Sequence, residues 1–460
     1  MSSPPPATRP TASNRLRPWL YSFYSHGTAM NHFLRRRIRP AGMGLLLVGV
    51  VLACLAGGQA SDAVFRLLSF AFTLGCLALF WLPFRGARLE IRRDLPQHAT
   101  AGVPVRLRYH ITNRGRGLRN AWLLESPPDP RPARQQFIHA HEPGEEKRNL
   151  FDRAFAYYCW NWLCERRLAF DPLPSEESLA LRRGEQQTIV AELTPRRRGL
   201  VPLDDLRLLL PDPLGFYQRS VKVDGGDATL AILPRRHRLP NVELPGTARF
   251  QPGGDATSRN TGPSGEFVAL RDYQPGDPPR LIHWKSWART GKPIIKELED
   301  SFYPRHGLIL DTFPEAGDEE LFEEAVSVAA SFVSAIDTRE CLIELMFISG
   351  REQVVTAGRG TGRAEGLLEV LAGVEPSPKP EFDSLKRLVM RHSEDLAGCL
   401  AVLSGWSDER ARLLQRLAAA GIEIAAIVVC DEMPAVIRPR THFVRSGHLA
   451  EDLMKLPDKL

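Results

Sequence analysis

Two long runs of uncharged, mostly apolar residues stand out near the start of the chain. They span Ala41–Gly58 and Leu67–Phe84, and each has 18 residues. At about 1.5 Å per helical residue, each run would extend about 27 Å, close to the thickness of a bilayer's hydrocarbon layer. The connection Gln59–Arg66 is too short to form a domain. The pattern predicts a hairpin of two transmembrane helices within residues 35–85.

Arginines flank this hairpin on both sides and are scarce in its connection. Four precede the first run and four follow the second: Arg35, Arg36, Arg37, Arg39, Arg85, Arg88, Arg92 and Arg93. The positive-inside rule then places both ends of the hairpin, and the whole chain after it, in the cytoplasm. Two alternatives stay open. One is a cleaved signal peptide, suggested by the lipoprotein-like stretch Val51–Cys54, and the other is a pair of buried helices in a soluble protein.

Short strand-like runs follow the hairpin. In Val103–Tyr109 apolar and polar residues alternate, which is typical of a half-buried strand. Leu206–Leu210 and Ala228–Leu233 are further short apolar runs, and Pro, Gly and Asp bound them. Several short strands separated by turn residues are typical of a β-sandwich. We therefore expect a β-sandwich domain over residues 86–240.

An insertion, residues 135–187, is expected to interrupt this domain. Its stretch Asn149–Leu168 carries aromatic residues at helical spacing. The spacing predicts a helix, which could pack on the membrane face or on the sandwich.

Beyond a linker at 241–264, which is rich in Gly, Pro, Thr and Asn, strands and helices alternate. Continuous apolar runs predict buried strands at His306–Leu310, Cys341–Ile348, Gly398–Leu403 and Ile422–Val429. Apolar residues on one face predict helices at Asp318–Ile336 and Asp408–Ala420. Residues 265–460 are therefore expected to form an α/β domain whose largely parallel sheet is covered on both faces.

The charge of the chain is distributed unevenly. The net charge is +6, yet Met1–Pro40 alone contains seven Arg and no acidic residue, so the remainder carries −1. Basicity confined to the segment before the hairpin fits anionic lipid headgroups better than nucleic acid. Residues 1–34, with Pro4–Pro6 and scattered Ser, are expected to form a disordered basic arm.

The seven cysteines are scattered along the chain. Cys159 and Cys164 have no matching second pair, so no zinc site is predicted. An odd, scattered set suits a reducing cytoplasm.

The segment Gly265–Glu299 combines charges of both signs with aromatic residues. Pro275 and Gly276 fit the two central positions of a type II turn, where Gly accepts a positive φ. Such a turn would bring Arg271 and Asp272 back towards Asp277 and Arg280. The segment is either a paired structural network or a site for a ligand or partner.

The motifs of this segment resemble the signature of the domain-of-unknown-function 58 family. They lie at Gly265–Phe267, Leu270–Tyr273, Pro275–Asp277, Arg280–Lys285 and Ala288–Arg289. Two positions depart from the pattern: His283 stands where Asp or Asn is common, and Trp287 where Ser or Thr is common. The resemblance marks these candidate partner or structural residues: Glu266, Arg271, Asp272, Tyr273, Gly276, Asp277, Arg280, Trp284, Lys285 and Arg289.

The resemblance implies a von Willebrand factor A-like, Rossmann-like fold for the α/β domain. In that fold an Asp-x-Ser-x-Ser loop at the carboxyl ends of the strands can hold a metal. Asp311 takes the Asp position, but Phe313 and Glu315 stand where the serines belong. A hard cation would lose two oxygen ligands there, so Asp311 is a weak candidate and no functional metal site or other cofactor is expected.

The resemblance also implies a function. Members of this family are often associated with MoxR-type AAA+ ATPases. We therefore expect a multi-pass protein of the bacterial inner membrane that faces the cytoplasm. It would be an adaptor that works with such an ATPase on client proteins, with no catalytic residue of its own and no nucleic-acid partner. The alternative is a hydrolase or phosphate-handling enzyme that uses the charged segment 271–289.

Overall fold

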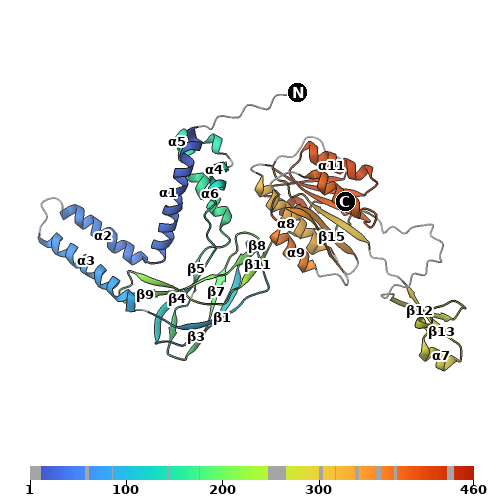
Figure 1. Cartoon of the computed structure of the whole chain (residues 1–460), viewed down its shortest axis with the longest axis horizontal. Coiled ribbons are helices and arrows are strands. Elements are labelled where there is room, and N and C mark those ends of the chain that lie inside the picture. The colour runs from blue at the N-terminus through green and yellow to red at the C-terminus, as the bar shows by residue number, and fades with distance from the viewer. Residues whose placement is uncertain are drawn as a thin grey trace. The chain divides into compact units, whose positions relative to one another are not determined.

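The computed structural model describes residues 12–56, 62–84, 86–142, 144–175, 177–246, 266–299, 304–315, 318–336, 341–358, 364–377, 381–431 and 440–460. The chain divides into two compact units. The first comprises Met1–Arg236 with Leu368–Val374, and the second comprises His237–Leu367 with Glu375–Leu460. Figure 1 shows the elements of both units, and each unit is described by itself below.

The N-terminal arm is helical over most of its length. The disorder expected for residues 1–34 is wrong from Ala12 onward, because α1 spans Ala12–Arg35. Leu20 on α1 is buried among Phe137, Cys159 and Trp160. The composition suggested disorder, but a buried face of α1 packs on a part of the chain more than 100 residues away.

The insertion supplies that partner surface. It forms α4 (Arg134–His139), η2 (Glu145–Lys147), α5 (Leu150–Phe155) and α6 (Tyr157–Arg167). The single helix expected over Asn149–Leu168 is broken at Ala156, whose φ is 48°. The buried guanidinium of Arg17 donates to the carbonyls of Phe137 and Ala140 and pairs with Glu145 at 3.1 Å. The buried side of the insertion therefore packs on α1. The two expected locations were the membrane face and the sandwich, and neither included this helix.

The apolar hairpin is present as two helices. α2 spans Pro40–Ala56 and α3 spans Asp62–Trp81, followed by η1 (Leu82–Phe84). The stretch Asp62–Phe84 is long and apolar enough to cross a membrane, whereas α2 is a shorter apolar helix. Arg66, expected in the connection, lies within α3. The structure thus confirms two consecutive apolar helices and moves the start of the second one to Asp62.

Three sheets of the first unit enclose one apolar core. The first sheet consists of β1 (Leu89–Asp94), β3 (Val105–Asn113) and β7 (Gln186–Leu193). The second consists of β10 (Gln218–Lys222), β9 (Asp205–Pro211), β4 (Leu118–Ser126) and β5 (Leu173–Pro174), with β6 (Leu179–Leu181) paired to β4. The third consists of β2 (His98–Thr100), β11 (Thr229–Leu233) and β8 (Gly199–Pro202).

The expected alternation of β3 is confirmed, since Leu107, Tyr109 and Ile111 all face the core. Val103 precedes the strand and is exposed. The helical part of the insertion ends at Arg167. The rest of the expected insertion, up to residue 187, supplies β5, β6 and the start of β7.

A six-stranded sheet, with strand order β16-β15-β14-β17-β18-β19, forms the centre of the second unit. Its strands are β14 (Arg305–Leu310), β15 (Leu342–Ser349), β16 (Arg351–Ala357), β17 (Gly398–Ser404), β18 (Ile424–Cys430) and β19 (Thr441–Arg445). All neighbours are parallel except β15 and β16. Its helices are α8 (Glu319–Ala335), α10 (Phe382–His392), α11 (Asp408–Ala419) and α12 (Leu449–Leu453), while α9 (Ala364–Gly373) begins in this unit and belongs to the first unit from Leu368 onward.

Both faces of this sheet are covered, as the continuous apolar strands predicted. Leu388 of α10 and Leu417 of α11 share one core cluster with Met346, Cys399 and Ala426 of the strands. On α8 the residues predicted to form one helix face are buried. The expected linker begins later than residue 241. The Glu243 N–H donates to the Asp458 carbonyl at 2.7 Å, and residues 247–264 lie outside the described part.

Candidate functional site

The signature segment forms a two-stranded antiparallel ribbon. β12 (Glu266–Asp272) pairs with β13 (Ile294–Glu299), and the strands are joined through η3 (Pro279–Leu281) and α7 (Trp284–Thr290). Figure 1 labels β12, β13 and α7. We call residues 266–299 the signature ribbon.

A tight turn follows β12, as the sequence predicted. The Asp277 N–H donates to the Gln274 carbonyl at 3.0 Å, which places Pro275 and Gly276 in the two central positions. Gly276 has a φ of 107°, in the positive region that a type II turn requires of its second central residue. A side chain at this position would strain the backbone.

The turn brings Arg271 onto Asp277. The two guanidinium nitrogens of Arg271 donate to the two carboxylate oxygens of Asp277, each at 2.7 Å. The Gln274 N–H adds a third donor at 2.8 Å. Asp277 is buried and Arg271 is half-buried. Bidentate pairs of this kind fix geometry as well as adding energy, so this pair is the framework of the signature ribbon.

The other candidate residues of the ribbon are more open to solvent. Exposed are Asp272, Tyr273, Gly276, Arg280, Trp284, Lys285 and Arg289. Glu266 lies at the start of β12 opposite Glu299, and its side chain falls outside the described residues. The structure thus joins Arg271 and Asp277 and leaves most of the other candidates on the surface.

The two departures from the family pattern have local structural roles. His283 is the N-cap residue of α7, the position where Asp or Asn would normally cap a helix. Its Nδ1 lies 2.6 Å from the Ser286 hydroxyl, so the pair joins the cap residue to the first turn by side chains. Trp287 stacks on Trp284 with ring centroids 5.2 Å apart and an interplanar angle of 18°. Trp284 is nonetheless 64% exposed.

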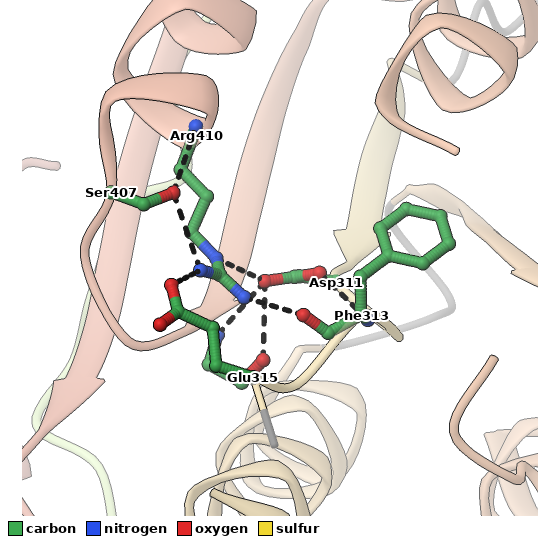
Figure 2. A network of polar contacts seen from close by, with 6 residues as sticks. Asp311, Phe313, Glu315, Ser407 and Arg410 are labelled. Carbon is green, nitrogen blue, oxygen red and sulfur yellow. Dashed lines mark hydrogen bonds and ion pairs between the residues drawn. The ribbon is translucent and has the colours of Figure 1, made fainter. Parts of the chain in front are cut away.

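A second polar site lies at the carboxyl edge of the six-stranded sheet. Asp311 follows the last residue of β14 and is 0% exposed. One of its oxygens accepts from the Phe313 N–H at 2.9 Å. The other accepts from the N–H and the hydroxyl of Ser404, at the end of β17, at 3.2 and 3.1 Å. Figure 2 shows this network.

The cation beside Asp311 is a side chain of the protein, the guanidinium of Arg410. The Nε of Arg410, in the first turn of α11, donates to Asp311 at 2.7 Å. Its other nitrogens donate to the Phe313 carbonyl at 2.6 Å and to the Glu315 carboxylate at 3.3 Å. Ser407 caps the helix by accepting from the Arg410 N–H. Arg410 is 1% exposed, and Figure 2 shows its guanidinium between Asp311, Phe313 and Glu315.

This arrangement does not fit a metal ion at Asp311. A divalent cation would meet the Arg410 guanidinium on the carboxylate oxygen that it would use. Phe313 and Glu315, which stand where the expected metal-binding loop would have serines, instead direct a carbonyl and a carboxylate at Arg410. Nor do the residues that the structure describes contain a group of three or more His, Cys, Asp or Glu able to hold a metal ion.

Sequence reasoning missed Arg410. It is 99 positions from Asp311, and its neighbourhood, a Ser-capped helix start rich in charge, looks like an ordinary solvated first turn. Arg410 can be identified only in the structure, where the start of α11 lies beside the ends of β14 and β17.

The region of the chain that is similar to known proteins contains both of these sites. Residues 269–440 match the family described as protein of unknown function DUF58, a range that extends from β12 through β18. Uncharacterized protein YeaD of Bacillus subtilis (strain 168) is 30% identical over 151 residues, which cover 32% of this chain and 36% of that protein. The chain thus spans about a third of the length of this curated relative. The DUF58 match thus includes Asp311 and all of the signature ribbon except its first three residues.

Proposed function

We propose that this chain is a membrane-anchored adaptor that works with a MoxR-type AAA+ ATPase in the assembly or maturation of client proteins. In this proposal α2 and α3 cross the inner membrane of a bacterium, and both soluble units face the cytoplasm. The β-rich unit is a β-sandwich, and the six-stranded sheet with its helices is a von Willebrand factor A-like domain.

Membrane anchoring is supported by the surface of the two apolar helices. Leu47 on α2 and Phe72 and Phe80 on α3 are 67%, 72% and 66% exposed. Soluble proteins rarely expose apolar surface of this extent, because each side chain removed from water contributes about 1.5–3 kcal/mol. A bilayer would cover this surface. The arginines at the hairpin's ends would hold those ends on the cytoplasmic side.

The observation that carries the adaptor proposal is the indole stack on α7, in which Trp284 is exposed and Trp287 is half-buried. Trp284 and Trp287 lie flat on one another at the surface, and the exposed Lys285 and Arg289 lie on the same short helix. Trp and Arg dominate the binding energy of protein interfaces. A stacked pair has already lost side-chain freedom, so less entropy is lost when a partner binds. The Arg271–Asp277 pair is well placed to hold this surface in shape.

The alternative, a hydrolase or phosphate-handling enzyme, is favoured by one contact. The His283 imidazole lies 2.6 Å from the Ser286 hydroxyl, the distance expected of a base and a nucleophile. The same contact is also explained locally, because the two residues are the N-cap and the third residue of α7 and so lie on adjacent positions of one helix turn. Asp277 is a poor candidate base, since both its oxygens accept from Arg271.

Co-purification of the full-length, detergent-solubilised protein tests the adaptor proposal. We expect Trp284→Ala to abolish recovery of an AAA+ ATPase in the presence of ATP. Trp19→Ala is the matched control, because Trp19 on α1 is also 64% exposed. It should keep the partner. Equal recovery of the ATPase with both variants, or its absence from the wild-type sample, would refute the role given to the indole stack.

Reporter fusions test the topology separately. A reporter that is active only outside the cytoplasm should be silent after Leu460 and active between α2 and α3. An active fusion after Leu460 would contradict the cytoplasmic placement of both units.

A further inference from the structure

The corner between α1 and α2 is fixed against the edge of the β10-β9-β4 sheet. The Arg39 N–H donates to the Phe216 carbonyl at 3.0 Å, and the Gln218 N–H donates to the Arg37 carbonyl at 2.8 Å. A Cβ on Gly42 would lie 2.1 Å from the Phe216 carbonyl oxygen, so the first turn of α2 approaches this closely only because Gly has no side chain. The base of the apolar hairpin therefore has a defined position on the first unit.

A pocket of about 470 Å³ opens beside this corner. That volume lies within the range of small-molecule sites, about 300–1,000 Å³. Its lining has a basic part and an apolar part. The basic part consists of His32, Arg35, Arg36 and Arg39, and the apolar part includes Ile38, Trp122, Leu124 and Leu209. No Asp or Glu occurs among the described residues that line it.

The positive charge around this pocket exceeds the charge that neutralises it. Arg36 pairs with Asp205 at 3.1 Å, and the same carboxylate also accepts from the Nε of Arg207. One carboxylate is thus shared by two guanidiniums. Burial, and after it the charge of Arg36 and that of Arg35, lower the pKa of His32. The imidazole is therefore neutral at pH 7, and the positive field comes from the guanidiniums.

We propose that this corner pocket binds one anionic phospholipid. The headgroup phosphate lies between Arg35 and Arg39, and the first part of an acyl chain lies on Trp122 and Leu124. The Arg39 guanidinium is 5.0 Å from the centroid of the Trp122 ring, so its position is fixed by stacking before a lipid arrives. This inference rests on the membrane anchoring proposed above, because only a spanning α2 brings the corner to the level of the headgroups.

Native mass spectrometry of the full-length protein, released from detergent containing phosphatidylglycerol or phosphatidylcholine, tests the proposal. We expect the wild type to retain phosphatidylglycerol about tenfold more than phosphatidylcholine, because both lipids carry a phosphate but the arginines of the pocket repel the choline cation of phosphatidylcholine. Arg35→Gln should remove the preference, and Arg35→Lys should keep part of it. Arg106→Gln is the control, because Arg106 is an exposed arginine on β3 outside the pocket.

Three results would overturn the proposal. One is equal retention of the two lipids by the wild type, and another is an unchanged preference in Arg35→Gln. The third is displacement of the lipid by inorganic phosphate at equal concentration, which would show a site for free anions instead. Carbonate extraction of membranes distinguishes a failure of the membrane-anchoring proposal from a failure of the corner-pocket proposal. A wild-type protein that is extracted refutes the anchoring. A wild-type protein that stays in the membrane but lacks the lipid preference refutes the corner pocket alone.

Discussion

The buried pair of Arg410 and Asp311 makes Arg410→Met an informative perturbation of the sheet's carboxyl edge. Met occupies most of the space of the arginine stem, so the main loss is the guanidinium. The Asp311 carboxylate then stays buried with the donors of Phe313 and Ser404 but without a cation. Removing one partner of a buried ion pair costs about 3–5 kcal/mol. Because these donors remain, we expect the lower end, about 3 kcal/mol.

Two further variants separate the ion pair from simple truncation. Adding Asp311→Asn to Arg410→Met removes the stranded charge, so the double variant should be more stable than the sum of the single effects predicts, by about 1–3 kcal/mol. Arg416→Met is the matched control on the same helix. Its partner Asp383 is 3.0 Å away, but both side chains are exposed, so the change should stay within about 0.5 kcal/mol.

Hydrogen exchange of the β14 and β17 amides is the suitable measurement, because a chain of two units does not unfold in one step. In the full-length protein, Arg410→Met should accelerate exchange in these strands on the order of 100-fold. Exchange no faster than in Arg416→Met would show that Arg410 does not stabilise the edge. Additive effects of Asp311→Asn and Arg410→Met would show that the two groups do not act as a pair.

Three other outcomes follow from the structure. Arg271→Ala should destabilise the signature ribbon by about 3 kcal/mol because it removes the guanidinium that pairs with the buried Asp277, whereas Arg289→Ala, at an exposed position of α7, should stay within about 0.5 kcal/mol; equal hydrogen exchange of the β12 and β13 amides in the two variants would contradict this. Millimolar Mg²⁺ should not slow hydrogen exchange of the β14 and β17 amides in the wild-type protein, because Arg410 already pairs with Asp311; a saturable slowing that Asp311→Asn removes would refute this. Burial raises the pKa of Cys399 to about 12, so at pH 8 this thiol should resist maleimide until the protein is denatured; rapid labelling of Cys399 itself in the folded protein, located by peptide mapping because Cys54 and Cys76 are exposed, would be inconsistent with the core packing.

Periodicity in the sequence predicted the elements whose stability is local. The face of α8 and the continuous strands β14, β17 and β18 follow from the spacing of apolar residues, and the structure confirms them. The turn at Pro275–Gly276 was predictable for the same reason, since its geometry depends on the two residues themselves.

The features that sequence reasoning missed depend on distant partners. Residues Ala12–Arg35 looked disordered by composition, yet Arg17 and Leu20 find a complementary surface in the insertion. No local pattern shows that a helix near the start of the chain will share a core with Phe137 and Trp160. The break at Ala156 is of the same kind, since nothing in the residue itself requires a positive φ.

Arg410 also changes how the departures at residues 313 and 315 are interpreted. Taken from the sequence, Phe313 and Glu315 only remove two ligands from a metal site. In the structure they supply a carbonyl and a carboxylate to a guanidinium, so they suit a cation that the chain provides. The Arg410 guanidinium cannot dissociate as a metal ion can. A partner's carboxylate therefore finds no open coordination position at Asp311. This is why the adaptor proposal assigns recognition to the indole stack of α7, with its exposed Trp284, rather than to the edge of the sheet.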